Sequence, residues 1–227
     1  MTQGGKKPTK AERKEHARKA RLEELKRRQR KARMRKIYYG VIVALALAGI
    51  VLLIITSGKA GRKKVADVNR IAAQAGCDKV TNPPDQKNSH ITPPATFQYS
   101  SNPPTSGSHY AGNTPQGPAP ALTGVHTSPI QDEIQVHNLE HSHLVIQYKT
   151  GLDQDLVTKL EDFVKDHDKQ MLIAPRVDMP YELSFTAWDT LVGCKNPNAK
   201  AVDLAKAFRD AFSNKGPEGF IAGQPAT

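Results

Sequence analysis

The longest apolar run in the chain covers residues 37–56 and contains no charged side chain. A helix of this length, rising about 1.5 Å per residue, would span about 30 Å, the thickness of a bilayer's hydrocarbon core. Tyr38 and Tyr39 stand where interfacial aromatic residues are common, and Lys and Arg flank both ends. The run therefore predicts one transmembrane helix. It is apolar all round, unlike the core helix of a soluble protein, and the basic arm before it is too long for a cleavable signal peptide.

Positive charge is concentrated ahead of this run. Residues 1–36 hold 16 Lys and Arg against 4 Glu, whereas the rest of the chain holds 17 bases and 18 acids, for a total net charge of +11. The excess of bases on this flank predicts a single-pass signal-anchor in the plasma membrane, with a cytoplasmic N-terminus and an extracytoplasmic C-terminal domain. The arm is rich in helix-forming residues, and we expect it to lie on anionic lipid headgroups. Nucleic acid is not an expected partner, because the basicity belongs to the arm alone.

Small residues recur every four positions inside the apolar run. Gly40, Ala44 and Ala48 would share one face of the helix. This spacing lets two helices approach closely in a membrane, so it is consistent with a homodimer.

Beyond the span the composition changes twice. Residues 57–81 have apolar positions at helical spacing and predict a juxtamembrane helix that ends near Gly76. Residues 82–133 form a Pro-rich wrap or linker, since 10 Pro fall between positions 82 and 129. The aromatic residues Phe97, Tyr99 and Tyr110 would pin an ordered wrap across a core, whereas the proline content alone also fits a disordered spacer.

Residues 134–214 have the pattern of a globular core. Apolar runs predict strands at 144–148, 171–174 and 183–188, with 191–194 as a candidate further strand, and amphipathic patterns predict helices at 153–168 and 201–212. The β-α-β-β-α order predicts an α+β exported domain, a small mixed sheet with flanking helices, preceded by the transmembrane helix and the basic helical arm. Residues 215–227 are rich in Gly and Pro and predict a flexible tail.

The chain has two cysteines, Cys77 and Cys194, and both follow the span. In an oxidising space they would pair, closing a long loop; two buried free thiols are the alternative. No C-x-x-C motif is present, so the chain does not fit a dithiol oxidoreductase.

Candidate metal ligands cluster at residues 137–143, which contain three His and one Glu. As a helix, His137, Glu140 and His141 would form the H-x-x-E-H pattern of inverted zinc peptidases. As a strand, His137, His141 and His143 would point to one face. Asn138, Ser142 and the apolar run that follows favour strand or turn over helix.

His109 or Glu140 could complete a zinc or copper site with these histidines. The alternative is a polar network in which they bond to Tyr110 or to the backbone without an ion. His90, His126 and His167 are interpreted as incidental.

Several of these motifs together resemble the bacterial domain of unknown function 3105 family. They are P-P-T-S-G-x-H-Y at 103–110, V-H-x-L-E-H-x-x-L-V-I-x-Y at 136–148, A-P at 174–175 and T-A-W at 186–188, and the resemblance runs roughly from residue 93 to residue 212. It implies an exported, often membrane-anchored domain with no assigned activity. The family pattern has Gly after L-E-H where this chain has Ser142. We therefore set His143 aside, and the candidate metal ligands are His109, His137, Glu140 and His141.

Three functions fit these observations. The first is a binding or accessory module of the cell envelope, holding a metal ion through His and Glu without being an enzyme. The second is a metal-dependent hydrolase with Glu140 as general base. The third is a scaffold whose working part is the basic arm.

Overall fold

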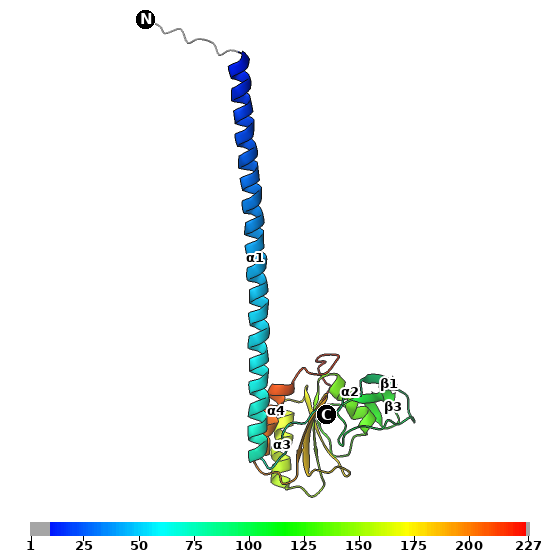
Figure 1. The fold of residues 1–227 in the computed structure, drawn as a ribbon. Coiled ribbons are helices and arrows are strands. Elements are labelled where there is room, and N and C mark those ends of the chain that lie inside the picture. The colour runs from blue at the N-terminus through cyan, green and yellow to red at the C-terminus, as the bar shows by residue number, and fades with distance from the viewer. Residues whose placement is uncertain (1–9, 226–227) are drawn as a thin grey trace. The chain divides into compact units, whose positions relative to one another are not determined.

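The computed structural model describes residues 10–225, and the chain divides into two compact units between Lys59 and Ala60. One helix, α1 (Lys10–Gln74), runs through this division (Figure 1). The basic arm, the apolar run and the start of the juxtamembrane segment, which we expected as separate helices, are thus continuous. The reason is local, because Pro is absent from residues 10–74 and nothing in that stretch forces a break.

Up to Lys59, α1 carries the basic arm and the apolar run. Among the described residues it is the one helix long and apolar enough to cross a membrane, and its length and composition fit a membrane anchor or a signal sequence. The arm is stabilised by ion pairs one turn apart, Lys19 with Glu15 at 2.8 Å and Arg28 with Glu24 at 2.6 Å. Each such exposed pair contributes about 0.3–0.5 kcal/mol.

The second unit is built on a five-stranded mixed sheet with the strand order β5-β7-β6-β8-β9. Strands β5 and β6 are parallel to β7, whereas β8 is antiparallel to both β6 and β9. The strands are β5 (Gly124–Val125), β6 (Leu144–Tyr148), β7 (Met171–Pro175), β8 (Leu183–Ala187) and β9 (Thr190–Cys194). Helices α3 (Gln154–Lys165) and α4 (Ala201–Phe212) complete the α+β class that the sequence predicted. Strand β9 is the candidate further strand at 191–194, and β5 is a strand that the sequence pattern did not predict.

Buried residues alternate between the two faces of this sheet. Ile146 and Ile173 point to the face that packs against α3, α4 and the end of α1, in the main hydrophobic core. Their chain neighbours Val145 and Leu172 point to the other face, where they pack against α2 (Asp132–Glu140). Figure 1 shows α3 and α4 on one side of the sheet and α2 with the small strands on the other. The second face of the sheet therefore determines where α2 lies.

The Pro-rich segment is ordered and carries four short strands in addition to β5. Strand β1 (Asn88–Ile91) is parallel to β2 (Gly107–Tyr110), and β3 (Gly112–Thr114) is antiparallel to β4 (Gly117–Ala119). Aromatic side chains fasten the segment, since the Tyr110 hydroxyl donates to the Ala95 carbonyl and the Tyr99 hydroxyl to the Ser108 carbonyl, each at 2.8 Å. This is the ordered wrap rather than the disordered spacer.

Residues 215–225, for which the sequence predicts a flexible tail, form backbone hydrogen bonds with the rest of the domain. The backbone N–H of Ile221 donates to the His141 carbonyl at 3.3 Å, and that of Gly223 to the Lys169 carbonyl at 2.8 Å. Thr123 N–H donates to the Gln224 carbonyl at 2.9 Å. Gly and Pro prevent regular structure here but leave the backbone free to bond to neighbouring segments. Residues 1–9 of the predicted arm and 226–227 of the tail lie outside the described residues.

The end of α1 is joined to the sheet by a disulfide between Cys77 and Cys194, which are 117 residues apart in sequence. Gly76 precedes it with a φ of +75°, the left-handed conformation that commonly ends a helix. A Cβ at this position would meet the Asn196 carbonyl oxygen at 1.9 Å, so only glycine fits. The turn and the bond together attach α1 to the edge strand β9.

Replacing both cysteines, as Cys77→Ser with Cys194→Ser, should lower the free energy of unfolding by up to about 4–5 kcal/mol, because the long loop is no longer closed in the unfolded chain. Urea unfolding of the full-length protein in detergent measures this loss. Reductant should shift the wild-type curve to the same midpoint and leave the double variant unchanged. Two titratable thiols in the unfolded, unreduced wild-type protein would contradict the disulfide.

Candidate metal centre

Four side chains that offer metal-ligand atoms converge beside α2. The ligand atoms of His90, His109, His137 and Glu140 all lie within 4.8 Å of one another. Measured from Glu140 Oε2, the Nε2 atoms lie at 3.0 Å for His109, 3.7 Å for His90 and 3.8 Å for His137. Three imidazole nitrogens therefore surround one carboxylate oxygen.

Strands β1 and β2 bring the first two imidazoles together. Their parallel register pairs His90 with His109, and the neighbouring Ser89 and Ser108 hydroxyls are hydrogen-bonded at 2.7 Å. Paired residues in adjacent strands project to the same face, so the two rings lie with centroids 5.1 Å apart.

Helix α2 supplies the other two ligands. Val136 and Leu139 pack against the sheet. His137 and Glu140 each follow one of these positions and, three residues apart, lie on one face of the helix, where they meet the imidazoles of the two strands. The start of the helix is tied down as well, because Asp132 forms an ion pair with Arg176.

The carboxylate of Glu140 is buried, with 2% of its side chain exposed. Burial alone raises its pKa, but the hydrogen bond from Asn88 to Oε1 and the neighbouring His109 outweigh that effect, so the pKa is lowered overall. Glu140 is thus an anion inside the protein. A buried charge is costly unless it is paired, so the group needs a compensating positive charge.

His109 is fully buried between two acceptors. Its Nδ1 lies 2.8 Å from the Gly107 carbonyl oxygen and its Nε2 lies 3.0 Å from Glu140 Oε2. A neutral imidazole has a single N–H and can satisfy only one of these oxygens, leaving a lone pair against the other. With Glu140 ionised, a metal ion on Nε2 would satisfy the lone pair that faces the carboxylate.

His137 is held in a form suited to ligation. Its Nδ1 lies 2.6 Å from the Tyr110 carbonyl oxygen, so this nitrogen carries the proton and Nε2 has the lone pair. Burial lowers the pKa of His137 to about 4, despite the opposing hydrogen bond to Tyr110. Near neutral pH the ring is uncharged and its Nε2 can accept a proton or an ion.

Of the predicted ligands, His109, His137 and Glu140 lie together, whereas His141 lies outside the group of four. His141 instead places its Nε2 2.9 Å from His137 Nε2 and faces Glu218 with its Nδ1. His143, which we had set aside, turns away and bonds to the Ile221 carbonyl at 2.7 Å.

The strand or turn favoured for residues 137–143 is wrong up to Glu140, where α2 ends, whereas His141 and Ser142 form a turn before β6 begins at Leu144. Asn138 did not act as a turn former. Its side chain bonds to both backbone groups of Ala121 instead. Ser142 does end the helix, with a φ of +65°. The H-x-x-E-H pattern of His137, Glu140 and His141 therefore lies on one turn of helix and its C-cap.

His90 was interpreted as incidental, yet it is a member of the group. A signal was present in the sequence, because Ser89-His90-Ile91 and Ser108-His109-Tyr110 repeat the same order of small, imidazole and apolar side chains. Such a repeat predicts two similar strands side by side. His126 and His167 bond instead to the carbonyls of Leu122 and Phe163.

A family model described as "Protein of unknown function (DUF3105)" matches residues 90–222, which include all four side chains of the group. Nothing among the curated proteins or the solved structures matches the chain.

The variant Asn138→Ala should lower the free energy of unfolding by about 2–4 kcal/mol, since it leaves the buried N–H and carbonyl of Ala121 without partners. The measurement is urea unfolding of the full-length protein. Asn113→Ala, at an exposed position, is the matched control and should change stability by less than about 0.5 kcal/mol. Equal midpoints for the two variants would show that Asn138 does not hold α2 in place.

Proposed function

The chain belongs to the DUF3105 family of proteins of unknown function, and we propose that it is a membrane-anchored, extracytoplasmic domain that binds a divalent transition-metal ion through His90, His109, His137 and Glu140. The structure supports a His/Glu group that could hold a metal. The observation that carries the proposal is the position of His109 between two acceptors, since a metal ion on Nε2 resolves that conflict.

The spacing of the four side chains supports ligation of one ion. Four ligands about 2.0–2.2 Å from a tetrahedral ion are roughly 3.4 Å apart. Glu140 Oε2 lies 3.0, 3.7 and 3.8 Å from the three Nε2 atoms, which is close to that spacing, and all four ligand atoms lie within 4.8 Å of one another.

The surroundings of the ligands support it too. Ligating histidines usually donate their second N–H to a carbonyl or carboxylate, which fixes the ring. The Nδ1 atoms of His109 and His137 lie at such distances from the carbonyls of Gly107 and Tyr110. Asn88 in turn holds the Glu140 carboxylate.

The donor set selects the kind of ion. Three imidazoles and one carboxylate suit zinc and copper(II), whereas calcium and magnesium prefer sites made of oxygen alone. His90 has 54% of its side chain exposed, so an ion could reach the group from that side.

A binding or accessory module of the cell envelope is better supported than a metal-dependent hydrolase. Structural zinc sites are closed by four protein ligands, whereas catalytic sites keep one position for water. Glu140 lies inside the group as one of four ligands, so its carboxylate is not free to act as general base on a bound water.

The membrane part of the proposal rests on α1. Its apolar run and the basic arm before it favour an uncleaved anchor with the N-terminus in the cytoplasm. We also propose that the basic arm contacts anionic lipid headgroups. Two chains would pair as a homodimer through Gly40, Ala44 and Ala48.

The variant His90→Asn should weaken zinc binding at least about tenfold, because changes to residues that only orient a ligand already cost about 10–100-fold. Competition with a chromophoric chelator, on the full-length protein in detergent, measures the affinity. The matched control is His16→Asn, because His16 is also exposed but lies on the basic arm, outside the group of four ligands. This variant should bind zinc as tightly as the wild type does. The proposal fails if the wild-type protein, reconstituted with zinc or copper(II), retains no stoichiometric ion.

Alkaline phosphatase fused to the C-terminus should be active in bacterial cells, and the same enzyme fused after residue 36 should be inactive. The reason is that it needs disulfides, which form only outside the cytoplasm. Enzyme activity normalised to fusion abundance is the readout. Activity of the second fusion and not of the first would mean that the orientation is reversed.

A further inference from the structure

A second group of possible ligand atoms adjoins the first. Glu140, His141 and Glu218 place one ligand atom each within 4.8 Å of the others, and Glu140 belongs to both groups. His141 Nδ1 lies 3.4 Å from Glu218 Oε2, the spacing of two ligands on one tetrahedral ion.

The imidazole of His141 turns its Nδ1 toward the Glu218 carboxylate. A neutral imidazole has one N–H, and with that proton on Nε2 the lone pair available to an ion is on Nδ1. This nitrogen is buried, and it has no hydrogen-bond partner among the described residues.

Glu218 is held at this position by the backbone of the C-terminal segment. Its N–H donates to the Glu140 carbonyl at 3.3 Å, and the N–H of Gly216 donates to the Ser142 hydroxyl at 2.8 Å. A Cβ at Gly216 would meet the Glu140 carbonyl oxygen at 2.2 Å, so this close approach requires glycine. The carboxylate is therefore placed next to the end of α2 by specific contacts.

We propose that Glu140, His141 and Glu218 bind a second divalent transition-metal ion of the zinc class, and that the Glu140 carboxylate bridges the two ions. The inference rests on the proposed first ion, because Glu140 is shared. Carboxylate-bridged ions in proteins are typically about 3.5–4 Å apart, which suits two groups with a common ligand.

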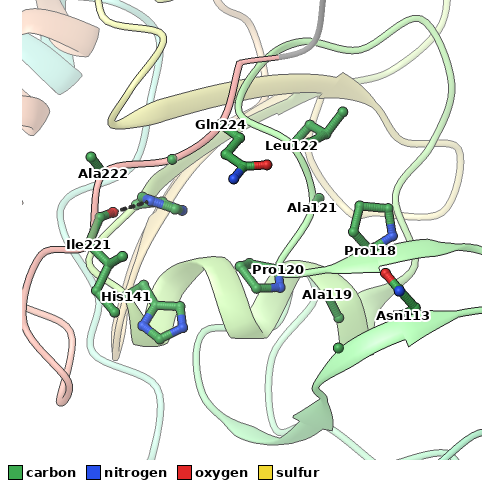
Figure 2. A pocket seen from close by; sticks show the side chains of 13 residues that line it. Asn113, Pro118, Ala119, Pro120, Ala121, Leu122, His141, Ile221, Ala222 and Gln224 are labelled. Atoms are coloured by element: carbon green, nitrogen blue, oxygen red, sulfur yellow. Dashed lines mark hydrogen bonds between the residues drawn. The ribbon is translucent and has the colours of Figure 1, made fainter.

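The second site would differ from the first in having three protein ligands instead of four. An ion with three protein ligands keeps a position for water or an external ligand. A cavity of about 350 Å³ lies against this side, lined by His141, by Ile221 and Gln224 of the C-terminal segment, and by Asn113 and Pro120. Figure 2 shows the His141 imidazole at one end of this cavity and Asn113 at the other. Of the three ligands, His141 is among the residues that line this cavity, so a water or external ligand would reach the second ion from this side.

The test counts ions bound to the full-length protein in detergent, after removal of metal by a chelator, equilibration with zinc and elemental analysis. The wild type should retain two zinc ions per chain and Glu218→Gln one. Titration with cobalt(II), followed by visible absorbance, should show two phases for the wild type and one for the variant.

Glu182→Gln is the matched control, since Glu182 is as exposed as Glu218, 43% against 45%, and also forms one ion pair. It should retain two ions. Equal thermal unfolding of the metal-free variants shows that Glu218→Gln remains folded. One ion in the wild type and one in Glu218→Gln would overturn the second site and leave the first standing. Two ions in Glu218→Gln would overturn the ligand assignment, and none in the wild type would overturn both sites.

Discussion

The negative charge of Glu140, buried at the end of α2, is the constraint around which the second unit is arranged. Its side chain is 2% exposed, and three imidazoles and the Asn88 amide surround it. Within the protein this charge has to be balanced by positive charge, and neutral histidines cannot supply it. His109 meets an acceptor at both ring nitrogens, and a metal ion on its Nε2 would supply that charge. The metal proposal follows from that requirement more than from the number of histidines.

The position of Glu140 depends in turn on how α2 packs. Val136 and Leu139 lie against Val145 and Leu172 of the sheet, while the opposite face of the helix lies under β2. Every residue from Glu133 to Glu140 is buried. A helix covered on both sides has no solvent face, and its polar side chains must find partners within the protein. Asn138 does so with Ala121, and His137 with Tyr110. Asn138 and His137 are thus held in place by hydrogen bonds within the protein instead of by contact with water.

Two segments without long elements complete these surroundings. The Pro-rich wrap brings His90 and His109 to the helix through the pairing of β1 with β2. The C-terminal segment brings Glu218 to the other side of the same helix end. Both segments are ordered by hydrogen bonds with the rest of the domain. Composition does not reveal such bonds, so it was consistent with a linker for the first segment and predicted a flexible tail for the second. They place ligand atoms on two sides of one carboxylate.

By itself, the sequence determined the features that depend on local pattern. The apolar run in α1, the strands β6 to β8, and the helices α3 and α4 follow from hydrophobic periodicity. Two cysteines in one chain limited the disulfide to a single pairing. The motifs around His109, His137 and Glu140 indicated three of the four grouped side chains. Only the tertiary structure decided that α2 is a helix, because its buried polar face removed the amphipathic signal. It also decided that His90 joins the group while His141 faces Glu218, since strand register and the return of a distant segment are set by contacts between residues far apart in the chain.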